Sequence, residues 1–310
     1  MELILLVLGI VLLALWFAKR RQSAPVVVDI VIYPIKSCGE YRVSKVAINN
    51  TGMIFDREWV LLTPNNQIVT QRENSKLLRL MPNLIVEGEE IKAMELSLDG
   101  QKIRFSPVKT GEVVKFECKS VMCEGIEEGK EVAEFLRKVF VEDYRLVRVF
   151  KHRQLNKHPR YQGLVSDDYK TTFMDAAQFL ILSEESFNLT RDQLPKEKKD
   201  GLDMVAFRGN IVVRGCRPFE EDTWSRFQIG NVEFQGIGRC PRCKITTVNI
   251  KTLEYDDNYE PVTTLRKLNG NGTKGYLGMH CVRLNNAETP GEIQVGQRVL
   301  VKDTKKFPDI

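Results

Sequence analysis

The stretch GRCPRCKITTV, residues 238–248, decides how we interpret the fold and chemistry of this chain. It sets two cysteines three residues apart among three basic residues, namely Arg239, Cys240, Arg242, Cys243 and Lys244. Positive charge beside a thiol favours the thiolate, which is the nucleophile and the soft-metal ligand. The flanking segments, residues 227–234 and 244–250, are rich in β-branched residues and alternate as strands do. We therefore expect the two thiols to lie on a turn between strands.

Several kinds of site fit this C-x-x-C pair. The two residues could be ordinary buried thiols, because unpaired Cys often packs as a small apolar residue. A structural zinc site needs four ligands, and the remaining candidates lack paired spacing: Cys216, His280 and Cys281. A redox dithiol of the thioredoxin kind belongs beside a strand–helix–strand unit, whereas we predict strands on both sides. A single thiolate ligand to a metal cofactor remains open.

Polar and basic side chains adjoin predicted strands at three other places. A strand at residues 26–33 is followed by an ammonium and a hydroxyl, and a strand at residues 41–48 is followed by a guanidinium. A strand that begins at residue 211 is preceded by a guanidinium and an amide. Such groups suit a phosphate or the edge of a heterocycle, although each also occurs in ordinary turns. The side chains are Lys36, Ser37, Arg57, Arg208 and Asn210.

Together these motifs resemble those of the mitochondrial amidoxime-reducing components, a family of small MOSC-domain molybdenum enzymes, over about residues 28–301. The resemblance implies that Cys243 binds molybdenum and that Asp175 lies in the active site. It also implies a set of residues that bind the molybdenum cofactor (Mo-molybdopterin): Lys36, Ser37, Arg57, Ala176, Ala177, Arg208, Asn210, Pro241, Arg242, Cys243 and His280. Ala176 and Ala177 stand where the family commonly has hydroxyl groups, so only their backbone N–H groups can serve. His280 stands where the family often has Tyr.

The fold class that we predict is α+β and strand-rich. By resemblance, residues 22–57 and 151–310 form a MOSC β-barrel, which is interrupted by an inserted α/β region at residues 58–150. Inside the insertion, apolar residues at helical spacing predict a helix over residues 128–140, with a polar opposite face. We also expect a strand at residues 67–71 and a closing, hairpin-like pair of strands over residues 291–301.

An apolar run at residues 3–18 is followed directly by three basic residues, Lys19, Arg20 and Arg21. A secretory signal would carry its positive charge before the run, where this chain has Glu2. The run is slightly short for a full span, which needs about 17–25 residues, and the basic residues predict that the bulk of the chain stays cytosolic. We expect residues 1–21 to form a transmembrane signal anchor, with a cleaved targeting segment as the alternative. The resemblance implies the outer mitochondrial membrane.

By resemblance, the activity is the reduction of N-hydroxylated compounds (amidoximes, hydroxylamines and N-oxides), with electrons from NADH that pass through cytochrome b5 reductase and cytochrome b5. A basic stretch at residues 145–160 is either a solvated face or a landing site for an acidic electron donor. The formal net charge of +5 is too modest for a dedicated nucleic-acid binder. Seven cysteines without a disulfide-like framework suit a reducing compartment.

Two other functions remain open. One is a non-catalytic molybdopterin-binding or sulfur-carrier MOSC protein, although the chain lacks the pyridoxal-phosphate domain of a complete cofactor sulfurase. The other is a zinc-binding membrane scaffold that uses Cys240, Cys243 and either Cys216 or Cys281.

Overall fold

Eight strands form the large sheet of the protein, which a computed structural model describes over residues 24–155, 163–166, 169–284 and 290–309. Their order across the sheet is β2-β1-β15-β14-β18-β17-β16-β20, and every neighbouring pair is antiparallel except β14 and β15. Their bounds are β1 Val26–Ile32, β2 Tyr41–Val43, β14 Phe179–Ser183, β15 Ile211–Arg214, β16 Trp224–Ile229, β17 Val232–Pro241, β18 Tyr276–Arg283 and β20 Val299–Thr304.

Backbone hydrogen bonds join the last strand of this sheet, β20, to β1 near its other end. The N–H of Val27 donates to the carbonyl of Gln297 at 2.9 Å, and the N–H of Val299 donates to that of Pro25 at 2.6 Å. The start of β20 therefore meets β1, and the sheet curls into a barrel. Aromatic rings fill its inside: Phe227 stacks on Phe234 at 5.1 Å between centroids, and Phe179 meets Phe234 edge-on at 5.2 Å.

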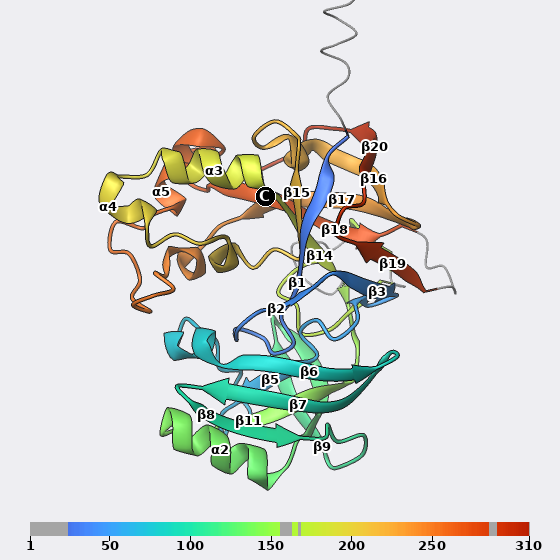
Figure 1. The fold of residues 1–310 in the computed structure, drawn as a ribbon, viewed down its shortest axis with the longest axis vertical. Helices are drawn as coiled ribbons and strands as arrows, with labels where there is room; N and C mark the ends of the chain where they lie inside the picture. Colours follow the sequence, from blue (N-terminus) through green and yellow to red (C-terminus); the bar gives the residue numbers. More distant parts are fainter. Residues whose placement is uncertain (1–23, 156–162, 167–168, 285–289, 310) are drawn as a thin grey trace, which may run out of the picture.

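Smaller elements surround the barrel. A three-stranded sheet has the order β19-β3-β4 (Gly291–Gln294, Lys45–Asn49, Gly52–Met53), and β12 (Arg153–Gln154) pairs with β13 (Lys170–Thr171). The helices α3, α4 and α5 gather on one side of the large sheet (Figure 1); they span Glu184–Asp192, Lys196–Lys199 and Val262–Leu268. Ser183, the last residue of β14, caps α3 by accepting a hydrogen bond from the N–H of Ser186. Short 3₁₀ helices are η4 Met204–Phe207, η5 Glu220–Thr223 and η6 Lys244–Thr247.

The inserted region forms a second layer below the barrel in Figure 1, drawn in cyan and green. It contains one sheet of order β5-β11-β10-β9 (Trp59–Leu62, Arg145–Lys151, Val121–Glu127, Val113–Cys118) and a second of order β6-β7-β8 (Met81–Glu87, Glu90–Leu98, Gln101–Phe105). The 3₁₀ helix η1 spans Ser75–Arg79. The predicted helix is confirmed as α2, Lys130–Phe140, and its apolar face is buried: Val132, Phe135, Leu136, Val139 and Phe140.

Four local predictions are wrong. The strand predicted over residues 41–48 is two strands, β2 and β3. Residues 67–71 form only an isolated bridge to β5. β19 and β20 pair with β3 and β16 rather than with each other. After Cys243 the chain enters η6 instead of a strand, because the hydroxyls of Thr246 and Thr247 donate to carbonyls three residues earlier and so favour a tight turn.

Among the residues that the structure describes, no helix has the length and apolar character needed to cross a membrane. The predicted anchor, residues 1–21, lies outside the described residues.

Candidate functional site

A pocket of about 260 Å³ opens between the barrel and the inserted region. It brings together Asp175 and ten of the eleven residues predicted to bind the cofactor. The lining comes from far-apart segments of the chain, and its members are Lys36, Ser37, Arg57, Arg72, Lys119, Met174, Asp175, Ala176, Ala177, Leu180, Ala206, Phe207, Arg208, Cys240, Pro241, Arg242, Cys243, Ile245, Thr246 and His280.

Cys243 presents its thiol to this pocket from the segment that follows β17. It is the single exposed cysteine of the seven, all of which the structure describes. Arg242 fixes this segment, since its guanidinium donates to the carbonyls of Leu277 at 2.9 Å and Phe207 at 2.8 Å. Cys240, three residues earlier, is buried in an apolar cluster. Both cysteines line the pocket, but Cys240 is largely buried whereas Cys243 is exposed, so the two thiols occupy different environments.

Two arginines lie together in the lining of the pocket. The guanidinium carbons of Arg57 and Arg208 lie 4.3 Å and 4.1 Å from the centroid of the Tyr33 ring. Arg57 donates to the Asp56 carboxylate at 2.5 Å and to the backbone carbonyl of Arg208 at 3.1 Å. Arg208 donates through Nη1 to the carbonyl of Cys38 at 2.8 Å. Burial, together with the charge of Arg57, lowers the pKa of Arg208 to about 10.

This arginine pair fits the phosphate of a pterin cofactor. Nη2 of Arg208 is buried without a hydrogen-bond partner, and an orphaned charged donor is costly unless a ligand satisfies it. Two carboxylates lie near the pair: Asp56 accepts from Arg57, and Glu40 interacts electrostatically with Arg208 without giving its Nη2 a hydrogen bond, so this donor is left for an anionic ligand. Ser37, Arg57 and Arg208 also adopt left-handed φ values of 66°, 48° and 54°. Such strain, of order 1–3 kcal/mol per residue, gathers at ligand sites.

Asp175 forms an ion pair with Lys36, whose Nζ also donates to the carbonyl of Phe173 at 2.8 Å. Nζ of Lys119 lies 3.9 Å from the second carboxylate oxygen. The surrounding protein partly shields Asp175 from water, which would raise its pKa, but the ammonium groups of Lys36 and Lys119 outweigh this effect and hold the pKa well below its usual range. The carboxylate therefore stays ionised, although 46% of its side-chain surface is exposed.

Asn210 is the one predicted cofactor residue that does not line the pocket. Its amide nitrogen donates to the carbonyl of Val31 at 3.1 Å and to Asp56 at 3.0 Å, while its oxygen accepts from the N–H of Leu180 at 3.2 Å. The side chain is fully buried. Asn210 therefore supports Asp56, which in turn holds Arg57. Ala176, Ala177 and His280 do lie in the pocket wall.

The basic stretch at residues 145–160 is less free than its sequence suggests. Arg145 pairs with Glu127 at 3.2 Å and Arg148 with Glu58 at 3.0 Å. Arg153 is buried and donates to backbone carbonyls. Residues 156–160 of this stretch lie outside the described residues, so the landing site stays a prediction.

Sequence reasoning assigned no role to four residues that shape the pocket: Tyr33, Asp56, Arg72 and Lys119. Asp56 and Tyr33 stand beside motifs that did attract attention. Arg72 and Lys119 come from the inserted region, and no local pattern sets them apart from other surface cations. Nη2 of Arg72 nevertheless lies 3.6 Å from the sulfur of Cys243.

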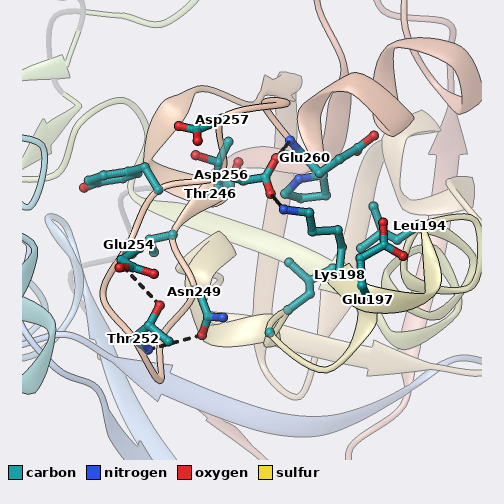
Figure 2. Close-up of a pocket in the computed structure, with 16 residues that line it drawn as sticks. Leu194, Glu197, Lys198, Thr246, Asn249, Thr252, Glu254, Asp256, Asp257 and Glu260 are labelled. Atoms are coloured by element: carbon teal, nitrogen blue, oxygen red, sulfur yellow. Dashed lines mark hydrogen bonds and ion pairs between the residues drawn. The ribbon is translucent and has the colours of Figure 1, made fainter.

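A second pocket, of about 280 Å³, lies on the other side of η6 and is lined by several acidic residues (Figure 2). Its polar groups already serve the local fold. Lys198 pairs with Asp256, the N–H of Glu260 donates to Asp256, and Asn249 accepts from the N–H of Thr252. It holds none of the residues predicted for the cofactor.

The described residues do not provide the ligands that a zinc-binding scaffold would need. Within the described ranges, no three His, Cys, Asp or Glu side chains are grouped so that they could hold a metal ion. Cys216 and Cys281 are both buried, whereas Cys243 is exposed.

Comparison with known proteins identifies the family of this chain. Residues 24–143 match the MOSC N-terminal β-barrel domain and residues 168–300 match the MOSC domain. The mitochondrial amidoxime reducing component 2 of Rattus norvegicus is 32% identical over 262 residues, which cover 80% of this chain and 74% of the rat protein. The chain belongs to the family of MOSC-domain amidoxime-reducing components. Its relatives include the mitochondrial amidoxime-reducing component 1 of Homo sapiens, 28% identical over 92% of this chain and 86% of that protein.

The family also has larger relatives. The molybdenum cofactor sulfurase of Homo sapiens is 24% identical over 89% of this chain, but the match covers only 32% of the sulfurase. The chain thus spans about a third of the length of the sulfurases that it matches. The first domain match, residues 24–143, includes β1 and β2, which we had assigned to the MOSC barrel with residues 151–310. In the structure, β1 and β2 belong to the large sheet.

Proposed function

We propose that this protein is a molybdenum-cofactor oxidoreductase that reduces amidoximes and other N-hydroxylated compounds. One observation carries the proposal: the single exposed thiol, Cys243, lies in the same pocket as the arginine pair Arg57 and Arg208. A soft thiolate suits a redox-active metal, and the arginine pair suits a phosphate. The relatives, which are amidoxime-reducing components and molybdenum cofactor sulfurases, support the same cofactor.

Different residues of the pocket would hold the phosphate, the metal and the pterin of the cofactor. Arg57, Arg208 and Ser37 would hold the phosphate, and Cys243 would be the protein ligand of the metal. Lys36, Ala176, Ala177, Pro241, Arg242 and His280 would line the pterin. Asn210 would act indirectly, through Asp56. The bound molybdenum supplies the two-electron chemistry, and the protein supplies position and access.

Asp175 would orient the substrate rather than act as an acid. Its pKa is held well below its usual range, so at neutral pH it carries no proton to give. An ionised carboxylate is a strong acceptor for the N–H and O–H groups of an amidoxime. The net reaction consumes two electrons and two protons and releases water, so those protons reach the open pocket from solvent.

Electron supply and location complete the proposal. Electrons would come from NADH through cytochrome b5 reductase and cytochrome b5. Residues 1–21 would anchor the chain in the outer mitochondrial membrane, with the catalytic part facing the cytosol. The apolar run and the basic residues after it support this orientation.

Reconstitution tests the activity. The full chain is produced in a host that makes molybdopterin and is mixed with NADH, cytochrome b5 reductase, cytochrome b5 and benzamidoxime. We expect NADH oxidation that needs all components and yields benzamidine. Cys243→Ser should abolish it, whereas Lys115→Gln, an exposed residue of β9 outside the pocket, should not. Molybdenum-loaded wild-type protein that reduces no N-hydroxylated compound would contradict the proposal.

That negative result would favour a second candidate, a non-catalytic carrier of molybdopterin or sulfur. The match to the human molybdenum cofactor sulfurase supports this alternative. The two functions share the pocket and differ in turnover, so the same assay separates them.

A further inference from the structure

The inserted region docks on the loop that carries Cys243. The hydroxyl of Tyr255 donates to the carbonyl of Gln71, and Nε2 of Gln71 donates to the carbonyl of Ile245 at 3.5 Å. Further along, Nη2 of Arg79 donates to the carbonyl of Lys251 at 2.8 Å. Three contacts therefore hold residues 71–79 against residues 245–255. These contacts determine the position of Arg72 in the lining of the pocket.

Two cations of the inserted region line this pocket, and the docking positions one of them, Arg72. Arg72 places Nη2 3.6 Å from the sulfur of Cys243. Lys119 lies at the tight turn between β9 and β10, where Lys119 and Ser120 both adopt left-handed φ values of 53° and 61°, and its Nζ is 3.9 Å from Asp175. We call Arg72 and Lys119 the cationic rim.

The remaining charges of the pocket are already assigned. Its lining holds six lysines and arginines, Lys36, Arg57, Arg72, Lys119, Arg208 and Arg242, against one carboxylate, Asp175. The arginine pair would hold the phosphate, Arg242 donates to backbone carbonyls, and Lys36 pairs directly with Asp175. The cationic rim therefore adds two positive charges to the pocket: Arg72 lies beside the thiol, and Lys119 is a second ammonium beside Asp175, which Lys36 already pairs.

We propose that the cationic rim selects anions, so that the site favours N-hydroxylated substrates that also carry a carboxylate. The assignment to a substrate rests on the proposed function, whereas the preference for anions belongs to this chain and is measurable without cofactor. Arg72 can form two parallel hydrogen bonds to a carboxylate, and Lys119 adds a point charge. A positive rim also raises the local concentration of anions at the pocket mouth.

Alkylation of Cys243 measures this preference directly. The full chain is prepared without cofactor and treated at low ionic strength with iodoacetate, which is anionic, or with iodoacetamide, which is neutral. Modification at Cys243 is followed by mass spectrometry, and the other six cysteines are buried. The ratio of the two rate constants cancels the intrinsic reactivity of the thiol, because both reagents attack the same population at one pH. The ratio therefore reports the charge around the sulfur.

We expect Arg72→Gln to lower the iodoacetate-to-iodoacetamide ratio about fivefold, the effect in water of one unit charge about 4 Å away. Lys119→Gln should lower the ratio by a smaller factor, because the Lys119 ammonium lies beside Asp175 rather than beside the sulfur. Arg72→Lys keeps the charge and should keep most of the ratio. Lys115→Gln removes the same charge from the same hairpin, outside the pocket, and should leave the ratio unchanged. Added salt should erase the differences. An unchanged ratio in both rim variants, with unfolding curves like those of the wild type, would overturn the proposal.

A kinetic test then connects the rim to substrate choice. In the loaded enzyme, Arg72→Gln should raise KM for 4-carboxybenzamidoxime about fivefold and leave KM for benzamidoxime unchanged, if one charge acts at about the same distance. If the alkylation ratio falls but neither compound is reduced, the anion preference stands and the proposed function fails. If both KM values rise equally, Arg72 has a general structural role and the substrate preference is refuted.

Discussion

Asp56 is the buried charge that supports the arginine pair of the pocket. Only 2% of its surface is exposed, and it accepts hydrogen bonds from the N–H of Tyr33 at 2.8 Å, from Arg57 at 2.5 Å and from Asn210 at 3.0 Å. Asp56→Asn preserves the shape of the side chain but removes its charge. It also replaces one acceptor oxygen with an NH2 donor, which then faces the surrounding donors. Removal of one partner of a buried ion pair leaves the other charge uncompensated and costs about 3–5 kcal/mol.

That loss is large beside a total stability of about 5–15 kcal/mol. Urea unfolding, followed by the fluorescence of the buried residues Trp59 and Trp224, would measure it. Asp99→Asn is the matched control, because Asp99 is half-exposed and pairs with Lys76 at 3.2 Å. A surface pair of this kind contributes about 0–1 kcal/mol. If the two variants lose similar stability, our interpretation of Asp56 as the support of the arginine pair is wrong.

Three further predictions concern the surroundings of the pocket. Burial raises the pKa of Asp222 to about 8, so the folded state binds the carboxyl proton more tightly than the unfolded state does. The stabilisation that this proton gives the folded state is complete below about pH 4 and is lost as the pH rises through 8. Wild type should therefore lose more stability than Asp222→Asn between pH 5 and 9, and equal slopes of unfolding free energy against pH would contradict this. Tyr255→Phe removes the hydroxyl contact to Gln71 and should cost about 1 kcal/mol, seen as faster amide hydrogen exchange in residues 71–79; unchanged exchange there would argue against the docking. Ser37→Gly relieves a left-handed φ of 66°, so it should raise the free energy of unfolding by about 0.5–1 kcal/mol while lowering molybdenum content; a loss of stability would show that φ is not strained.

Features with a local cause could be predicted from the sequence. The apolar periodicity of α2 and the Ser cap of α3 depend on neighbouring residues, and both are present. The C-x-x-C motif alone did not distinguish its two cysteines; the family resemblance selected Cys243 as the candidate ligand, and Cys243 is the exposed cysteine. The strand-like alternation after Cys243 led to a wrong prediction. Thr246 and Thr247 are β-branched, as strand residues often are, but their hydroxyls donate to backbone carbonyls three residues earlier.

Features that depend on long-range packing could not be predicted. Asn210 has the residue type of a ligand contact, but burial commits both of its amide hydrogens to Val31 and Asp56. Arg72 reaches Cys243 across 171 positions of the chain, through the docking of the inserted region. No pattern in the flanking residues signals such a contact. Charge balance inside a pocket becomes visible only when the lining is known.

The metal content of the full chain, produced in a host that makes molybdopterin, tests the central claim most directly. We predict about one molybdenum per wild-type chain, little or none in Cys243→Ser, and near wild-type content in Cys240→Ser, since Cys240 is buried in an apolar cluster. Molybdenum retained in full by Cys243→Ser, or zinc in its place in the wild type, would contradict the assignment of Cys243 as the metal ligand.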